Sequence, residues 1–156
     1  MIGKGTSQKQ MEANLDKRYQ TLVVLWFALL MSVVMYFVFS LFTPAMNDQP
    51  GNQPNSVLVI TLMVLGFLLV IISFAVKSKL LTRSIEKQDP TLVQKSLVIA
   101  CAMCEVSALL GLMERFLIGY RYYYFLFLFS AVGIALHFPR RIQLQNAGYR
   151  NQGQLS

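Results

Sequence analysis

Apolar residues fall into four long runs along the chain, separated by short polar segments. Within a run such as VLVITLMVLGFLLVIISFAV the apolar side chains follow one another without alternation. A run of about 17–25 apolar residues crosses the hydrocarbon core as a helix, whereas a barrel strand would alternate polar and apolar positions. Backbone amides in hydrocarbon must be paired within their own segment. The pattern therefore predicts four transmembrane helices, over residues 21–42, 56–76, 97–119 and 122–138.

The polar segment before the third run contains a helix start. Asp89 can accept a hydrogen bond from the first helical turn, and Pro90 suits the first helical position, where its missing N–H is not needed. The third helix should therefore extend from near Pro90 to near Gly119. At about 1.5 Å per residue this helix measures about 45 Å, so it should tilt or project from a hydrocarbon core of about 30 Å.

The polar flanks divide the chain into three parts. Residues 1–20 form a polar tail that we expect to be partly helical, residues 21–138 form the transmembrane domain, and residues 139–156 form a second polar tail. Within the second tail, the stretch QLQNAGYRNQGQLS, residues 143–156, has no apolar period and is expected to be loosely held. The loop TPAMNDQPGNQPN is too short and too rich in turn residues to be a domain.

Charge placement supports a membrane topology. Only 13% of the 156 residues are charged, against roughly 25% in soluble domains. The net charge of +7 could suggest a nucleic-acid partner, but lysine and arginine cluster before the first run, between the second and third, and after the fourth. The positive-inside rule then places both termini and the central loop in the cytoplasm. We expect an all-α antiparallel four-helix bundle in the inner membrane, N-in and C-in, with the lipid bilayer and not nucleic acid as its partner.

The first apolar run should remain as a membrane anchor. It is longer than the 7–15 residues typical of a signal-peptide core, and no A-x-A-like cleavage site follows it.

Small residues form a stripe on the third predicted helix. On a helical wheel the stripe spans about 60°, and its members are Ala100, Cys104, Ser107 and Gly111. Stripes of this kind let two membrane helices approach closely. We predict that this helix-packing seam faces neighbouring helices.

Glu105 is the candidate for membrane-embedded chemistry. An ionised side chain near the bilayer centre costs at least roughly 2.5–3.5 kcal/mol, so we expect Glu105 to be largely protonated or to face a polar cavity. Ser32 and Ser130 lie closest to it in predicted depth. Two interpretations stay open: Glu105 handles a proton or cation, or it is a buried acid that fixes the register of two helices.

A second polar group is predicted nearer the outer surface. Glu114 lies there, with Tyr36 and Thr61 at matching depths, and Arg115 follows it directly. Adjacent helical residues diverge by about 100°, so Arg115 should point outward and not face Glu114. We interpret this outer polar cluster as an interfacial feature.

Cofactor and metal sites are not predicted. His137 is the single histidine, which excludes a bis-histidine haem or multi-histidine metal site within the chain, and an interfacial position suits it. Cys101 and Cys104 form a C-x-x-C pair, but a redox pair of this kind works at a helix N-terminus, more than two turns away. Packing is the favoured role for both cysteines.

The stretch ACAMCEVSALLGL, Ala100–Leu112, resembles a segment of rotor-ring proteolipid subunits of rotary ATPases. The resemblance covers about a dozen residues and implies that Glu105 takes up and releases a coupling ion. Three features depart from that family: the first predicted span has no glycine, Glu105 lies on the first helix of its hairpin, and the hairpin loops are predicted on the outer side.

The sequence thus favours a non-enzymatic accessory or assembly subunit that packs against partner membrane subunits or further copies of itself. A proton- or cation-handling, proteolipid-like component using Glu105 is the alternative. A small membrane redox enzyme is a second alternative, supported by the C-x-x-C pair and the Tyr-rich start of the fourth run.

Overall fold

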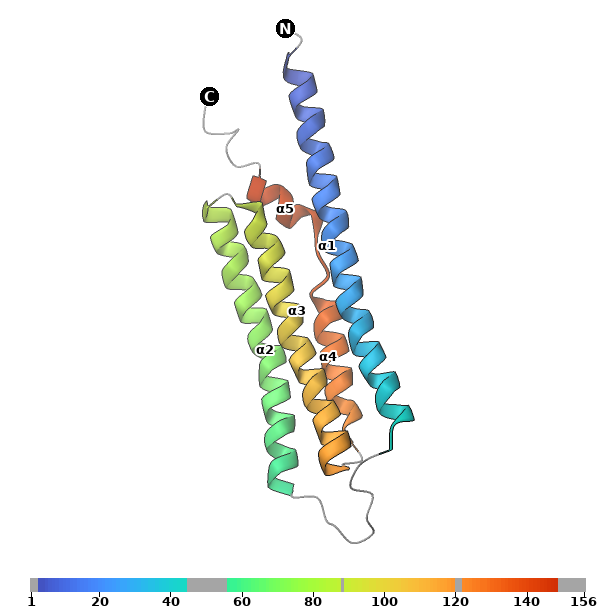
Figure 1. Ribbon diagram of the computed structural model, residues 1–156. Coiled ribbons are helices and arrows are strands. Elements are labelled where there is room, and N and C mark those ends of the chain that lie inside the picture. The colour runs from blue at the N-terminus through green and yellow to red at the C-terminus, as the bar shows by residue number, and fades with distance from the viewer. Residues whose placement is uncertain (1–2, 45–55, 88, 120–121, 149–156) are drawn as a thin grey trace.

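The computed structural model describes residues 3–44, 56–87, 89–119 and 122–148. This part of the chain is helical, without strands (Figure 1). Its elements in order are α1 (Gly3–Phe42), α2 (Ser56–Lys87), α3 (Pro90–Met113), the π-helical segment η1 (Glu114–Ile118), α4 (Tyr124–Leu136) and α5 (Arg141–Gly148). The prediction of an all-α protein is confirmed.

Three helical stretches are long and apolar enough to cross a membrane: Ala13–Phe42, Ser56–Lys87 and Thr91–Ile118. The fourth apolar helix, α4, has 13 residues, fewer than the roughly 17 that a membrane-spanning helix needs. α1 and α2 extend past the predicted spans into their polar flanks. Three long apolar helices and one shorter one therefore form the bundle.

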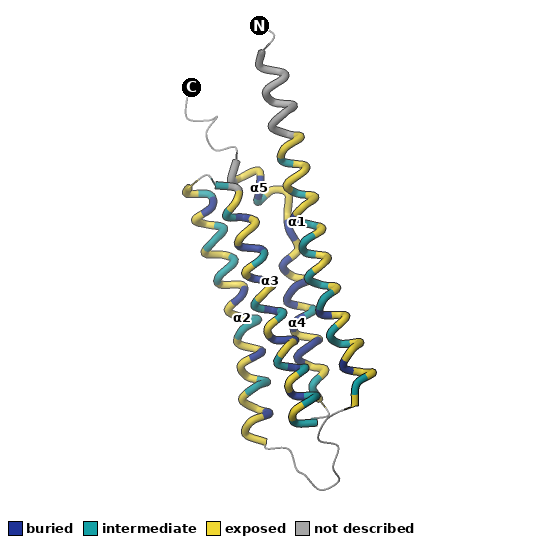
Figure 2. The backbone as a smooth tube through the Cα atoms, in the orientation of Figure 1, coloured by how far each residue is buried: buried dark blue, intermediate teal, exposed yellow. Residues whose placement is uncertain are grey.

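The third helix is central. α3 packs against α1, α2 and α4, whereas α1 and α2 lie on opposite sides of it and make almost no contact with each other (Figure 1). Buried residues follow one another along α3, while most of the large side chains on α1 and α2 are exposed (Figure 2). The small residues of α3 explain this position, because they let several helices approach one axis.

The start of α3 is as predicted. Asp89 is its N-cap and Pro90 its first residue, and the Asp89 carboxylate accepts hydrogen bonds from the Thr91 amide at 2.9 Å and the Thr91 hydroxyl at 2.6 Å. These bonds, above all the one from the hydroxyl, hold the pKa of Asp89 below its ordinary value of 3.8. Asp89 is therefore a stable carboxylate cap at neutral pH.

The third helix ends near Gly119, as predicted, but the geometry of its last turn was not predicted. The α-helix stops at Met113, and η1 continues the chain to Gly119, which has φ of 70° in the left-handed region. Glycine adopts this conformation without steric cost. The continuous α-helix expected up to Gly119 is therefore replaced, over its last turn, by the wider π geometry.

The expectation of a loosely held C-terminal tail was wrong for residues 143–148. They belong to α5, whose Leu144 is only 2% exposed, and Arg141 Nη2 at the start of α5 lies 2.5 Å from Asp16 Oδ1 on α1. Eight residues with one apolar anchor are too few for a hydrophobic period to be visible in the sequence. Residues 149–156 and most of the loop 43–55 lie outside the described residues.

Candidate functional site

The helix-packing seam of α3 faces α2 and α4. Ala100, Cys104 and Ser107 are fully buried, and Gly111 is buried as well. A Cβ atom added to Gly111 would lie 3.1 Å from the Cβ atom of Leu126 on α4. The seam therefore lies at a helix contact close enough to favour small side chains.

Two glycines on the neighbouring helices complete this contact. A Cβ atom at Gly133 of α4 would lie 2.8 Å from Cys104 Sγ, and one at Gly66 of α2 would lie 3.0 Å from Ser107 Oγ. We call the resulting α2–α3–α4 contact the three-helix core. The sequence pattern on α3 alone did not reveal these two partner positions.

A polar group that the sequence did not bring together lies within the three-helix core. Ser73 Oγ is 2.8 Å from His137 Nε2 and 3.5 Å from Cys104 Sγ, and Lys77 Nζ donates to the His137 carbonyl oxygen at 3.0 Å. Ser73, Cys104 and His137 are fully buried. The interfacial position expected for His137 stays a prediction, but its enclosure among three helices was not predicted. The sequence feature that could have indicated this polar group is the pair Ser73 and Lys77, which lie four residues apart on one face of α2.

His137 and Ser73 share a hydrogen bond inside the three-helix core. The Ser73 hydroxyl also donates to the Val70 carbonyl at 2.6 Å, and the imidazole tautomer decides whether Nε2 or Ser73 Oγ is the donor between them. Nδ1 has no hydrogen-bond partner in the described structure. Lys77 places its ammonium at the C-terminal end of α4, where the helix dipole favours a cation. These hydrogen bonds connect α2 to the end of α4, so the group has a structural role.

Glu105 has a partner on α1. Its Oε1 accepts a hydrogen bond from the Ser32 hydroxyl, which also contacts the Leu29 carbonyl at 2.7 Å. Ser32 was one of the two serines expected at this depth. Both Ser32 and Glu105 are half-buried, so the carboxyl lies at the edge of the α1–α3 contact and not in the three-helix core.

Ser130 does not join Glu105. It is fully buried in α4, and its hydroxyl has no hydrogen-bond partner in the described part of the chain. α4 packs on the seam of α3, more than 90° around the helix from Glu105 at 100° per residue. Matching depth was therefore not enough to predict this contact.

The outer polar cluster does not form as predicted. Glu114 is fully buried, and neither carboxyl oxygen has a hydrogen-bond partner among the described atoms. The Thr61 hydroxyl is exposed and donates to the Val57 carbonyl of its own helix, while Tyr36 packs against the hydrophobic core. Depth matched these residues, but their helix faces differ. Glu114 also opens η1, and π-helical turns are frequent at functional sites.

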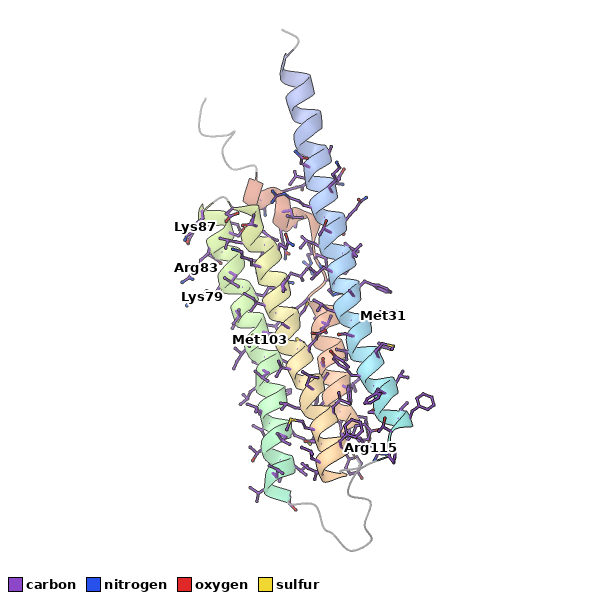
Figure 3. All side chains as sticks on the ribbon, viewed as in Figure 1. Met31, Lys79, Arg83, Lys87, Met103 and Arg115 are labelled. Carbon is purple, nitrogen blue, oxygen red and sulfur yellow. The ribbon has the colours of Figure 1, made fainter. Side chains whose placement is uncertain are left out.

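The side chain of Arg115 is neither buried nor fully directed outward as expected. Its guanidinium carbon lies 5.4 Å from the centre of the Tyr123 ring, a cation–π distance. The side chain is half-buried and not fully outward. Figure 3 shows Arg115 toward the end of the bundle that is remote from α5.

The cysteine pair lies in the middle of α3. Cys101 and Cys104 are free thiols and fully buried. In the residues that the structure describes, no group of three or more His, Cys, Asp or Glu side chains is arranged to hold a metal ion. The surroundings of the pair are those of packed small side chains.

An exposed apolar face on α3 is the feature with the clearest geometry for binding. We call it the outer face of α3. Its four large members are 43–45% exposed, its residues are spaced alternately by three and four, and it consists of Ile99, Ala102, Val106, Leu109 and Met113. This spacing is the one by which helices pack side by side. This three-and-four spacing is present in the sequence, but it is hard to recognise because the surrounding run is apolar on every side of the helix.

The outer face has defined borders. It lies between α1 and α2, which both contact α3 but hardly contact each other. A hollow of about 340 Å³ continues it toward the start of α3 and is lined by Thr91, Gln94, Lys95, Val98 and Ile99. Glu105 stands at its α1 border. A separate groove of about 310 Å³ lies between α1 and α4. Its lining side chains are apolar apart from Tyr124 and include Val34, Phe37 and Leu128.

Basic side chains mark one end of the bundle. Lys79, Arg83 and Lys87 are exposed at four-residue intervals on α2 and point away from the bundle near α5 (Figure 3). Their spacing puts them on one face of the helix, beyond the apolar part of α2.

Comparison of the chain with protein-family models, with curated proteins and with solved structures finds no match. The resemblance of Ala100–Leu112 to rotor-ring proteolipids therefore stays a prediction.

Proposed function

We propose that the protein is a non-enzymatic accessory or assembly subunit of a membrane complex, and that it acts by packing against the transmembrane helices of other subunits. The observation that carries this proposal is the outer face of α3. It combines helix-packing spacing, a small residue at Ala102 and flanking helices that leave the face open. Lipid packs against any apolar surface, whereas regular spacing with a small residue favours a helix.

The topology proposed for this role has four spans, with both termini and the loop between α2 and α3 in the cytoplasm and the protein in the inner membrane. Support comes from the basic end of α2, where Lys79, Arg83 and Lys87 lie at the same end as α5 and Asp89. Basic segments stay on the cytoplasmic side and are attracted to anionic headgroups. The short α4 fits this topology if its flanks, including Tyr122, Tyr123 and buried His137, are drawn into the membrane.

Native mass spectrometry after extraction in mild detergent tests the proposed function. A defined assembly containing other membrane subunits is expected, and Ala102→Phe should dissociate it because the added ring fills the outer face. Leu128→Phe is the matched control, since Leu128 is 55% exposed on α4 in the other groove. A stable monomer in the mildest detergents, indifferent to both variants, contradicts the proposal.

A second candidate function is proton or cation handling by Glu105. The hydrogen bond from Ser32 to its carboxyl at apolar depth supports this candidate, because ionisable groups inside a membrane often mark proton and ion paths. Fully buried Glu114 is the other carboxyl to be tested. Reconstituted protein should then show ion flux that falls in Glu105→Gln and after treatment with a hydrophobic carbodiimide. Unchanged flux in Glu105→Gln excludes Glu105 from this role.

A further inference from the structure

We infer that the outer face of α3 takes a transmembrane helix that carries a basic side chain at the depth of Glu105, so that this side chain pairs with the Glu105 carboxyl. The inference rests on the proposed function, because it specifies the chemistry of the partner that the subunit would bind. It adds a charge to what is otherwise an apolar contact.

The Glu105 carboxyl has more hydrogen-bonding capacity than the chain uses. A carboxyl group offers two oxygens and about four acceptor sites, and Ser32 is its one hydrogen-bond donor within the described structure. Glu105 is half-buried, so part of the group faces outward beside Ala102 and Val106. Hydrocarbon contains no hydrogen-bond donors, and a carboxyl left without partners there is costly.

The position of Glu105 suits a helix lying on the outer face. The face occupies one side of α3, and Glu105 lies about 80° around the helix from its centre line, toward α1, at 100° per residue. A helix lying on the face would cross this border with its own side chains. Ala102, one turn from Glu105 on the same side, leaves room for close approach.

Charge complementarity favours a basic partner over a second copy of this chain. In a two-fold dimer through the outer face, each face meets its own copy, and the two Glu105 carboxyls lie on opposite sides of the contact. The face of the copy consists of Ile99, Ala102, Val106, Leu109 and Met113, which offer no side-chain donor to either carboxyl. A lysine or arginine supplies both the missing donor and the opposite charge.

Lipid is the other occupant that would fill the face. Acyl chains cover Ile99, Leu109 and Met113 as well as a helix does, but they cannot donate to the carboxyl. The hollow beside Lys95 and Gln94 is wide and polar at one end, so a headgroup could enter there. The polar end, at Gln94 and Lys95, lies more than two turns from Glu105, too far to serve that carboxyl.

Peptide binding in vesicles tests the inference with the full chain. Trp26 is the single tryptophan and serves as the energy-transfer donor in phosphatidylcholine vesicles. The acceptors are dansyl-labelled leucine–alanine transmembrane peptides with lysine, leucine or glutamate at the central position. We expect the lysine peptide to bind about tenfold more tightly than the leucine peptide, as one interhelical polar contact would give, and the glutamate peptide to bind no better than the leucine peptide.

The variants separate charge from packing. Glu105→Gln can still accept from Ser32 but has no charge, so the preference for the lysine peptide should disappear while the leucine peptide binds as before. Glu114→Gln is the matched control and should keep the preference, because Glu114 is buried away from the outer face. Ala102→Phe should weaken all three peptides, and Leu128→Phe should weaken none.

Each remaining result overturns the inference in a distinct way. Equal binding of the lysine and leucine peptides, with both lost in Ala102→Phe, rejects the basic partner but leaves the accessory-subunit function standing. A lysine preference that survives Glu105→Gln also rejects it. Dimers of the chain that exclude every peptide reject it in favour of a second copy. Absence of any peptide binding, in a protein that native mass spectrometry also finds alone, rejects the proposed function as well.

Discussion

The α2–α3–α4 core and the α1 side of the bundle each contain a serine that hydrogen-bonds to a titratable side chain, but the two pairs differ in how far they are enclosed. In the core, Ser73 and His137 hold each other in a dry contact that glycines make close. On the α1 side, Ser32 and Glu105 meet at a border that is still half open. A polar pair enclosed by three helices stabilises the fold, whereas a pair at an open border leaves capacity for a partner. The same comparison predicts large effects on stability from core variants and small ones from variants around α1.

The largest loss of stability is expected from Gly133→Val. The new Cβ atom would lie 2.8 Å from Cys104 Sγ and 3.0 Å from Val70 Cγ1, so α4 must move away from α2 and α3. Overpacking of this kind costs about 3 kcal/mol or somewhat less. The free energy of unfolding in mixed detergent micelles measures the loss. Val132→Leu, on the exposed side of the same helix, should change the free energy of unfolding little. Equal destabilisation by the two variants would contradict the claim that the close contact at Gly133 stabilises the core.

A smaller loss is expected from Ser73→Ala. Removing the hydroxyl leaves Nε2 of fully buried His137 without its hydrogen-bond partner, which costs about 1–3 kcal/mol. The same unfolding measurement applies. Ser32→Ala provides the contrast on the α1 side, where the Glu105 carboxyl can relax toward its open border. If Ser32→Ala destabilises the protein more than Ser73→Ala, the distinction between the enclosed and the open pair is wrong.

Trp26→Phe should cost about 1 kcal/mol, the net value of one hydrogen bond. The variant removes the bond from Trp26 Nε1 to the Ile134 carbonyl, 2.7 Å long, and keeps an aromatic ring against Phe138. It tests how firmly α1 is attached to α4. Hydrogen exchange along α1 is the sharper readout, since exchange should rise there and not in α2. A rise in α2 as well would mean that the two sides are not independent.

The smallest effect is a dependence on pH from the cap of α3. The pKa of Asp89 is lower in the folded protein than its ordinary value of 3.8, so its contribution to stability is complete above about pH 4 and is lost as pH falls through the folded pKa. Asp89→Asn can still cap the helix but lacks the charge. The unfolding midpoint of this variant should therefore lie slightly below that of the native protein at pH 7 and converge with it as pH falls below the folded pKa of Asp89. A constant difference would contradict the assignment.

Helix positions were predictable from the sequence because continuous apolar runs and the Asp89–Pro90 pair are local signals. Contacts between helices were not, as Ser32 and Ser130 show. Both match Glu105 in depth, but only Ser32 lies on a helix that packs against the right side of α3. The burial of His137 and Leu144 was not predicted for a related reason. Their burial depends on where a short helix ends and where a late segment folds back, and neither is recorded in the pattern around them.

The contact between α5 and α1 also sets an order of events during synthesis. Asp16 emerges from the ribosome early, and its partner Arg141 follows only after every other described helix has been made. Leu144 closes over the same end of the bundle later still. The first helix must therefore stay beside the bundle without this attachment until residues 141–144 have been made. A chain that ends before residue 141 has no means of making it.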